Sequence, residues 1–249
     1  MALMRRQSSS GGEAGFSLIE LMVAMGVTLI IMTLASTVLM ECFNIRSRQN
    51  TRTAALADVQ RAVNIISREV ASAGYGLSTN GIVGCSGAAA STCDSGDNAI
   101  RVRSNLNRFN SDPVDADTAD DGEDVKFFIQ TTDGKRYVVR YDHNAASNKA
   151  TVLANRVDQL QFYYYDERVN YATRTYSAAA PDAALITNVR NNAGAAENEV
   201  APDLAKYVVI AIVVRLEAVG TPGIDGYQPE TQEMLVSDVA LRNNDLSNY

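Results

Sequence analysis

The apolar residues of the chain are concentrated in its first 45 positions. From Phe16 to Phe43 the sequence is largely apolar, and no charged residue lies between Glu20 and Glu41. A helix rises about 1.5 Å per residue, so this uncharged stretch of about 20 residues would span roughly 30 Å, the thickness of the hydrocarbon core of a bilayer. Small and hydroxyl-bearing residues within the stretch are tolerated in a membrane helix. The pattern therefore predicts a membrane-spanning helix.

Beyond Phe43 the chain turns polar but keeps a helical period. Six apolar positions three or four residues apart form one stripe: Leu56, Val59, Val63, Ile66, Val70 and Ala73. No proline occurs before Pro113, and Gly74-Tyr75-Gly76 provides a C-terminal stop. We expect one helix over residues 16–73. Its first half, residues 16–43, would lie in the membrane or a filament core, and the amphipathic half, residues 44–76, would carry a head domain.

After residue 76 the pattern changes to turns and short strands. Alternating or β-branched runs predict strands over residues 99–103, 125–131, 135–142, 151–154, 160–165, 207–216 and 234–241. Thr132-Asp133-Gly134 predicts a hairpin, and the apolar run 207–216 predicts a strand buried on both faces. The expected fold class is α+β, with an antiparallel sheet head over residues 77–249 packed on the helix stripe. Residues 167–205 are weakly patterned and are expected to form a long surface insertion.

Composition excludes several kinds of protein. The chain has 249 residues, 46% apolar and 20% charged, which is ordinary for a globular protein. Its net charge of −7 argues against a general nucleic-acid binder. The single histidine, His143, follows a strand in a polar turn and is expected to be exposed. No nucleotide loop, nucleophile elbow or zinc motif is present, so we expect no enzymatic activity and no cofactor.

Glu20 decides between three interpretations of the apolar segment. A signal peptide has a shorter apolar region, of about 7–15 residues, and a small-x-small cleavage site after it, which Met40-Glu41-Cys42 is not. A plain single-pass anchor fits the length. It does not explain a carboxylate one turn inside the segment, where a charge costs on the order of 2.5 kcal/mol or more. The third interpretation is that the chain carries a cleavage motif immediately N-terminal to the apolar segment.

The sequence Gly15-Phe16-Ser17-Leu18-Ile19-Glu20-Leu21 resembles the type IV prepilin signature of pilins and type II secretion pseudopilins. The resemblance implies that residues 1–15 are a leader, that a prepilin peptidase and N-methyltransferase cuts after Gly15, and that the new N-terminal residue, Phe16, is methylated. Cleavage there creates an ammonium that can pair with Glu20 of a neighbouring subunit. Charge counting alone would not set the orientation, because more arginines follow the span than precede it.

Several segments of the rest of the chain are similar, more loosely, to the PilW-type minor pilins. They are residues 68–75 at the helix end, 157–164, 213–215 and 239–243. J-type pseudopilins share some of these features. The N-terminal match covers about thirty residues, and the 167–205 segment matches neither group.

The resemblance implies a minor pilin of a type IV pilus. Such a subunit is held in the inner membrane with its head in the periplasm, and inner-membrane assembly machinery then packs it among other pilins through its helix. The alternatives are a type II secretion pseudopilin of the J type, and a membrane-anchored periplasmic binding protein or enzyme. Direct contact with nucleic acid is not expected from the acidic head.

Three cysteines are present. Cys85 and Cys93 could form a disulfide closing a nine-residue loop in an oxidising compartment. Such a bond would contribute on the order of 2.5 kcal/mol by loop entropy. The alternative is two free or metal-binding thiols, although their spacing is a poor metal pattern. Cys42 is expected to be a small apolar residue at the membrane edge.

Residues 112–124 contain seven acidic side chains and offer a weak calcium candidate at Asp115, Asp117, Asp120 and Asp121. The spacing departs from the EF-hand pattern, because Ala119 stands where a ligand is needed. A solvated acidic loop is the favoured interpretation, so no metal is expected.

Overall fold

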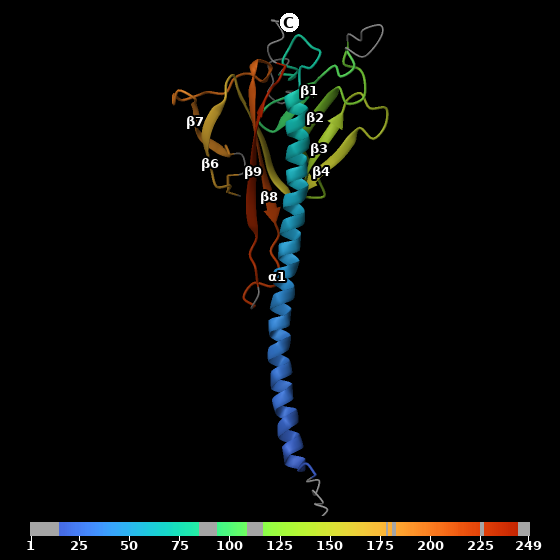
Figure 1. Ribbon diagram of the computed structural model, residues 1–249, viewed down its shortest axis with the longest axis vertical. Helices are drawn as coiled ribbons and strands as arrows, with labels where there is room; N and C mark the ends of the chain where they lie inside the picture. Colours follow the sequence, from blue (N-terminus) through green and yellow to red (C-terminus); the bar gives the residue numbers. More distant parts are fainter. Residues whose placement is uncertain are drawn as a thin grey trace, which may run out of the picture.

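The computed structural model describes residues 15–84, 94–108, 117–177, 179–180, 183–224 and 227–243. One helix, α1 (Leu18–Ser72), forms a long stalk with a β-rich head at its C-terminal end (Figure 1). A short 3-10 helix, η2 (Pro202–Leu204), precedes the penultimate strand. The strands in chain order are β1 (Ala99–Arg103), β2 (Asp124–Thr132), β3 (Lys135–Asp142), β4 (Ala150–Asn155), β5 (Val157–Tyr165), β6 (Val169–Thr173), β7 (Ile186–Asn191), β8 (Tyr207–Leu216) and β9 (Thr231–Ala240).

The described strands form three antiparallel sheets. The first is a meander in the order β1-β2-β3-β4, the second has the order β5-β8-β9, and the third is the β6-β7 pair. The first two sheets lie on either side of α1 (Figure 1). The expected α+β class, with antiparallel sheets packed on one long helix, is confirmed.

The end of α1 is fixed by a close approach between two backbone segments. Ala73 leaves helical geometry, and Gly74 follows with a φ of 77°. The amide of Gly74 donates to the carbonyl of Arg103, 2.9 Å away, which ties the helix end to β1. A Cβ on Gly81 would lie 2.0 Å from the nitrogen of Gly74, so no other residue fits there. The observed bounds of α1 lie within two residues of those expected.

The helix buries one stripe against the head. Its buried residues all lie in the C-terminal part and are small or β-branched: Ala55, Val59, Ala62, Val63, Ile66 and Val70. They join one hydrophobic core with residues from both large sheets. The expected stripe is confirmed except at Leu56, which is half-buried because the alanines at 55 and 62 face the sheets. Small side chains at these positions let the strands approach the helix closely.

Strand β8 is buried on both faces, as expected from its apolar run. Val208, Ile210 and Ile212 point into the core beneath α1. Val209 and Val213 point into a second core on the opposite face. The strand is therefore the central layer between the helix and the β6-β7 sheet.

The segment 167–205 differs from the expected surface insertion. It contains the β6-β7 hairpin, and Val169, Leu185 and Ile186 are buried against the outer face of β8. Its strands were not predicted because they are short and carry few apolar residues. Their burial depends on β8 and leaves no continuous periodic pattern in the segment.

The predicted hairpin at residues 132–134 is confirmed. Thr132 pairs with Lys135 across a two-residue turn. Asp133 and Gly134 have φ values of 51° and 72°, which are those of a type I′ turn. The predicted strands are found with small changes of bounds, the largest being at the starts of β5 and β9.

Replacing Ile66 by Ala should destabilise the head. Ile66 is fully buried between the helix and both large sheets, so the truncation should lower the free energy of unfolding by about 2–5 kcal/mol. Chemical denaturation of the full chain in detergent micelles would measure it. Ile31→Ala is the matched control, because Ile31 is 58% exposed on the same helix and its loss should change the value by less than about 0.5 kcal/mol. Equal losses in the two variants would contradict the described packing.

Candidate functional site

The N-terminal segment places its candidate processing bond just outside the helix. Gly15, Phe16 and Ser17 are exposed and precede α1. Ser17 is extended, with φ −71° and ψ 141°, and its carbonyl accepts the first helical hydrogen bond, from Leu21, at 3.1 Å. The bond between Gly15 and Phe16 is therefore open to a peptidase, and its cleavage would leave the whole helix on the product.

The hydroxyl groups within the apolar half of α1 are satisfied inside the helix. Thr33 donates to the carbonyl of Leu29 at 2.7 Å, and Ser36 donates to that of Met32 at 2.8 Å. Thr28 and Thr37 make similar bonds to the preceding turn. These side chains therefore present no unsatisfied polar atom to lipid or to another helix.

Glu20 is different from these hydroxyls. It lies exposed in the first turn of α1, and no side chain or backbone group in the described part of the chain donates to its carboxylate. The helix N-terminus favours a negative charge there, but by a modest amount. In an apolar surrounding a carboxylate needs a cation or strong donors. The described residues supply neither, so the carboxylate is open to a partner from another molecule.

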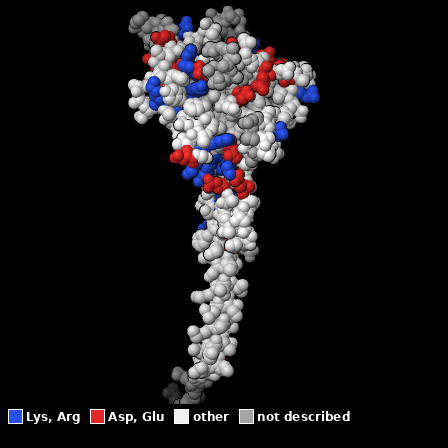
Figure 2. Space-filling view, turned by 180° about the vertical axis from the view of Figure 1, so that it is seen from behind, with Lys and Arg blue, Asp and Glu red and all other residues white. Residues whose placement is uncertain are grey.

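The surface around Glu20 is apolar and uncovered. Every residue from Phe16 to Phe43 is exposed, including bulky side chains such as Leu29 and Met32. The lower stalk carries no charged side chain on the face that Figure 2 shows, whereas charges gather on the head and at its base. An apolar surface of this length requires lipid or other helices around it.

Two arginines after the span hold the head against the stalk. The Arg52 guanidinium lies 2.5 Å from the carboxylate of Glu233 on β9. Arg48 donates to the carbonyl of Pro229 at 2.7 Å and to the hydroxyl of Thr231 at 2.9 Å. The connection between β8 and β9 runs down beside α1 (Figure 1). The sequence offers one signal for this contact, the spacing of four between the two arginines, but no indication of their partners.

Comparison with known proteins bears on this N-terminal segment. Residues 11–36 match the prokaryotic N-terminal methylation motif. No curated protein and no solved structure matches the chain. Together with the apolar helix and the antiparallel head, the motif supports a type IV pilin-like protein, a class that includes pilins and pseudopilins. The motif implies processing by a prepilin peptidase and assembly into pilus-like filaments.

The other candidate sites are not assembled by the described residues. Cys85 and Cys93 both lie outside the described residues, as does Asp115. Asp117, Asp120 and Asp121 are exposed, and no three acidic, histidine or cysteine side chains in the described ranges lie close enough to hold a metal ion. Cys42 is exposed on the stalk as a free thiol.

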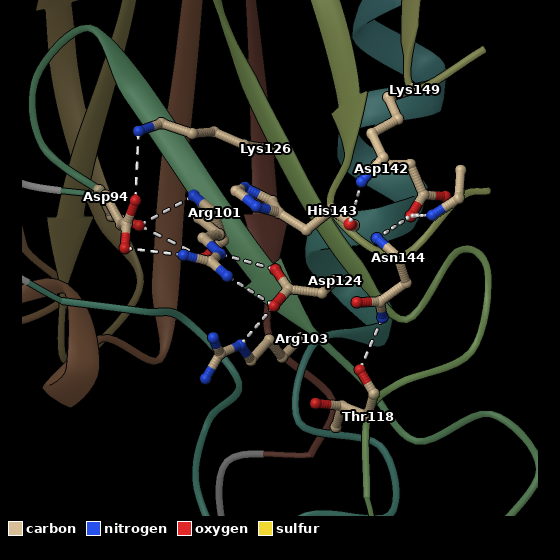
Figure 3. A network of polar contacts seen from close by, with 12 residues as sticks. Asp94, Arg101, Arg103, Thr118, Asp124, Lys126, Asp142, His143, Asn144 and Lys149 are labelled. Atoms are coloured by element: carbon tan, nitrogen blue, oxygen red, sulfur yellow. Dashed lines mark hydrogen bonds and ion pairs between the residues drawn. The ribbon is translucent and has the colours of Figure 1, made fainter. Parts of the chain in front are cut away.

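The head contains a polar network that the sequence did not reveal (Figure 3). Arg101 on β1 makes two bonds to the Asp124 carboxylate, at 2.6 and 2.7 Å, and a third to Asp94 at 2.9 Å. Arg103 donates to Asp124 at 2.8 Å, and Lys126 donates to Asp94 at 3.3 Å. The alternating arginines of β1 indicated that one face of the strand is charged. They did not indicate which strand supplies the carboxylate that they bind.

The charges of this network are mutually satisfied. Burial alone would raise the pKa of Asp124, but hydrogen bonds from Arg101 and Arg103 outweigh it and lower that pKa. The bond to Asp124 raises the pKa of Arg101. Both groups are therefore held in their charged forms, and the pair joins β1 to β2 instead of offering a reactive acid or base.

His143 is not exposed as expected. It is half-buried, its ring packs edge-on against Tyr141 with centroids 5.0 Å apart, and its Nε2 is buried without a hydrogen-bond partner. The ring points toward Arg101 (Figure 3). Burial, followed by the charge of Arg101, lowers the pKa of His143. The folded head therefore disfavours the protonated form of this side chain.

Acidification should destabilise the head through His143. Because its folded pKa lies below the ordinary value of about 6.5, the unfolded chain takes up the proton first, and stability falls as pH drops from 7.5 to 5. In His143→Gln this loss should be absent. Asp124, whose pKa is lowered, stays ionised throughout the window, so its contribution is constant. Burial raises the pKa of Asp158 and Glu199, so these carboxyls favour the folded head as pH falls. Their contribution is the same in the wild type and in His143→Gln.

The measurement is chemical denaturation of the full chain in detergent at pH 7.5, 6 and 5. The difference in unfolding free energy between the two proteins should move in favour of the variant as pH falls. A difference that does not change with pH would show that the imidazole takes up its proton equally well in the folded head.

Proposed function

We propose that this chain is a minor pilin of a type IV pilus, similar to the PilW type, and that it acts as a structural and assembly subunit and not as an enzyme. Glu20 is the observation that carries the proposal. It is a carboxylate with no partner among the described residues, at the start of an uncovered apolar helix, five positions after the glycine of a processing motif. A plain membrane anchor does not explain a carboxylate at this position, whereas in a filament the amine of an adjacent subunit can pair with it.

In the proposed mechanism the chain is first held in the inner membrane, with its head in the periplasm. A prepilin peptidase and N-methyltransferase cuts after Gly15 and methylates the new amine of Phe16, which stays cationic. That amine pairs with Glu20 of an adjacent subunit as the assembly machinery moves the helix from lipid into the filament core. Lipid and helix bundle are similarly apolar, so the transfer of residues 16–43 costs little, and the charge pair favours the bundle.

The minor-pilin proposal is supported by where the PilW-like segments lie. Residues 68–75 form the end of α1, and residues 157–164, 213–215 and 239–243 belong to or adjoin β5, β8 and β9. Arg242 donates its amide to the carbonyl of Ala71 at 3.3 Å, which links the last of these segments to the first. The similar segments thus form one packing unit of helix and sheet.

Replacing Glu20 by Gln or Ala should block assembly but not processing. Both variants remove the charge that the Phe16 amine needs, so recovery of the chain in sheared filaments should fall at least tenfold, while immunoblots still show the shortened form in membranes. Glu41→Gln is the matched control, because Glu41 is exposed on the same helix beyond the uncharged stretch. Normal incorporation of Glu20→Gln would contradict the charge-pair mechanism.

The choice between pilus and secretion system is tested by deletion in the native host. A minor pilin predicts loss or strong reduction of surface pili with protein secretion intact. Loss of secretion with normal pili would instead assign the chain as a J-type pseudopilin.

A further inference from the structure

Strand β9 forms the edge of the β5-β8-β9 sheet. It pairs with β8 over its whole length, from Thr231 to Ala240, and the pairing contains no bulge. No strand in the described part of the chain pairs with its other side. Natural proteins usually protect such edges with proline, lysine, a bulge or a covering segment. The sequence of β9 contains neither proline nor lysine, and its two charged residues, Glu233 and Asp238, are bonded to Arg52 and Tyr171.

The backbone phase of β9 is fixed by bonds at the two ends of β8. Beside its first residue, the amide of Leu241 donates to the carbonyl of Lys206 at 2.9 Å, so odd-numbered residues of β9 face β8. At the other end, the amide of Arg215 donates to the carbonyl of Arg156 at 2.8 Å. The odd-numbered residues of β8 therefore direct their backbone amides and carbonyls toward β5. The even-numbered residues of β8 direct these groups toward β9, where they pair with Glu233, Leu235 and Ser237. It follows that Gln232, Met234 and Val236 direct their amides and carbonyls away from β8. No hydrogen bond within the described chain satisfies these groups.

A groove lies beside the same part of the strand. Its volume is about 240 Å³, and it is bounded by residues 173–176 after β6 and by Val213, Gln232, Glu233 and Met234. Val213 and Met234 contribute apolar surface, and the segment after β6 contributes threonines and Arg174. A strand added to β9 would place alternate side chains on this face, where the groove can receive one of them.

The other half of the edge is partly covered. The hydroxyl of Tyr171 on β6 donates to Asp238 at 2.6 Å, which holds the β6-β7 sheet against the end of β9. The accessible length therefore runs from Thr231 to Val236, enough for a strand of about six residues, or roughly 20 Å.

We infer that this edge and groove bind an extended segment of a different pilin-like chain by strand addition. The inference rests on the proposed function, since it takes the partner to be a neighbour in the same filament. Unpaired amides and carbonyls at strand spacing are matched by another extended backbone. The groove favours an aliphatic side chain on the face that meets Met234.

A second copy of this chain does not fit the edge through its own β9. Strand β9 and helix α1 run in the same direction, because Arg48 contacts Thr231 and Ala71 contacts Arg242. Antiparallel pairing of two β9 strands would therefore direct the two helices oppositely, which one membrane or filament does not allow. In a parallel two-fold pair, equivalent residues face each other and cannot make the staggered bonds of a parallel ladder.

Hydrogen–deuterium exchange on the full chain tests the inference residue by residue. In the purified protein in detergent, the amides of Gln232, Met234 and Val236 should exchange rapidly. In sheared filaments that contain the chain they should slow at least tenfold, while the amides of Glu233 and Leu235, already bonded to β8, change little. Equal exchange of the three outward amides in both states would overturn the inference. The presence of the chain in those filaments would still support the proposed function.

A proline variant gives an independent test. Met234→Pro removes an outward amide without breaking a bond to β8, since proline is tolerated on the free side of an edge strand. It should be processed normally and melt within a few degrees of the wild type, but its recovery in filaments should fall at least fivefold. Ala240→Pro is the matched control, because it removes an outward amide beyond the groove. Equal recovery of the two variants would count against strand addition at the groove.

Discussion

The proposed assembly depends on one carboxylate, that of Glu20, which no group in the described part of the chain satisfies. Glu20 lies in the first turn of a helix that is uncovered over its first 26 or so residues, and the described chain offers it no cation. The hydroxyls of the same segment are all bonded within the helix, so Glu20 is the polar group that requires a second molecule. The methylation motif over residues 11–36 implies processing, and the proposed cleavage after Gly15 would create a suitable amine on every copy.

Beyond the apolar stalk, the chain forms a head with its own hydrophobic cores. The helix stripe around Ile66 forms the main core, and β8 divides that core from a second one under the β6-β7 sheet. Arg52 and Glu233 tie the head to the stalk just beyond the span. The network around Asp124 pairs three cations with two carboxylates and joins β1 to β2. Glu20 and the edge of β9 carry unsatisfied groups at the surface of the described chain, and these are the two places where we propose that other chains bind.

The sequence predicted the elements whose patterns are local and missed those that depend on distant partners. The apolar span, the stripe at Val59 and Val63, and the turn at Asp133 each follow from a short-range period or a turn residue, and each is found. The β6-β7 hairpin was missed because its burial is defined by β8. His143 was assigned to the surface because its neighbours in sequence are polar, whereas Tyr141 covers it in space. The candidate processing residues could be named from the motif, but that no other described residue pairs with Glu20 could only be seen in the structure.

The most direct test of the account is the mass of the N-terminal peptide of the chain recovered from native filaments and membranes. The account predicts a polypeptide that begins at a methylated Phe16, with residues 1–15 absent. A filament-incorporated chain that still carries Met1 through Gly15 would have no amine beside Glu20 and would contradict the central claim.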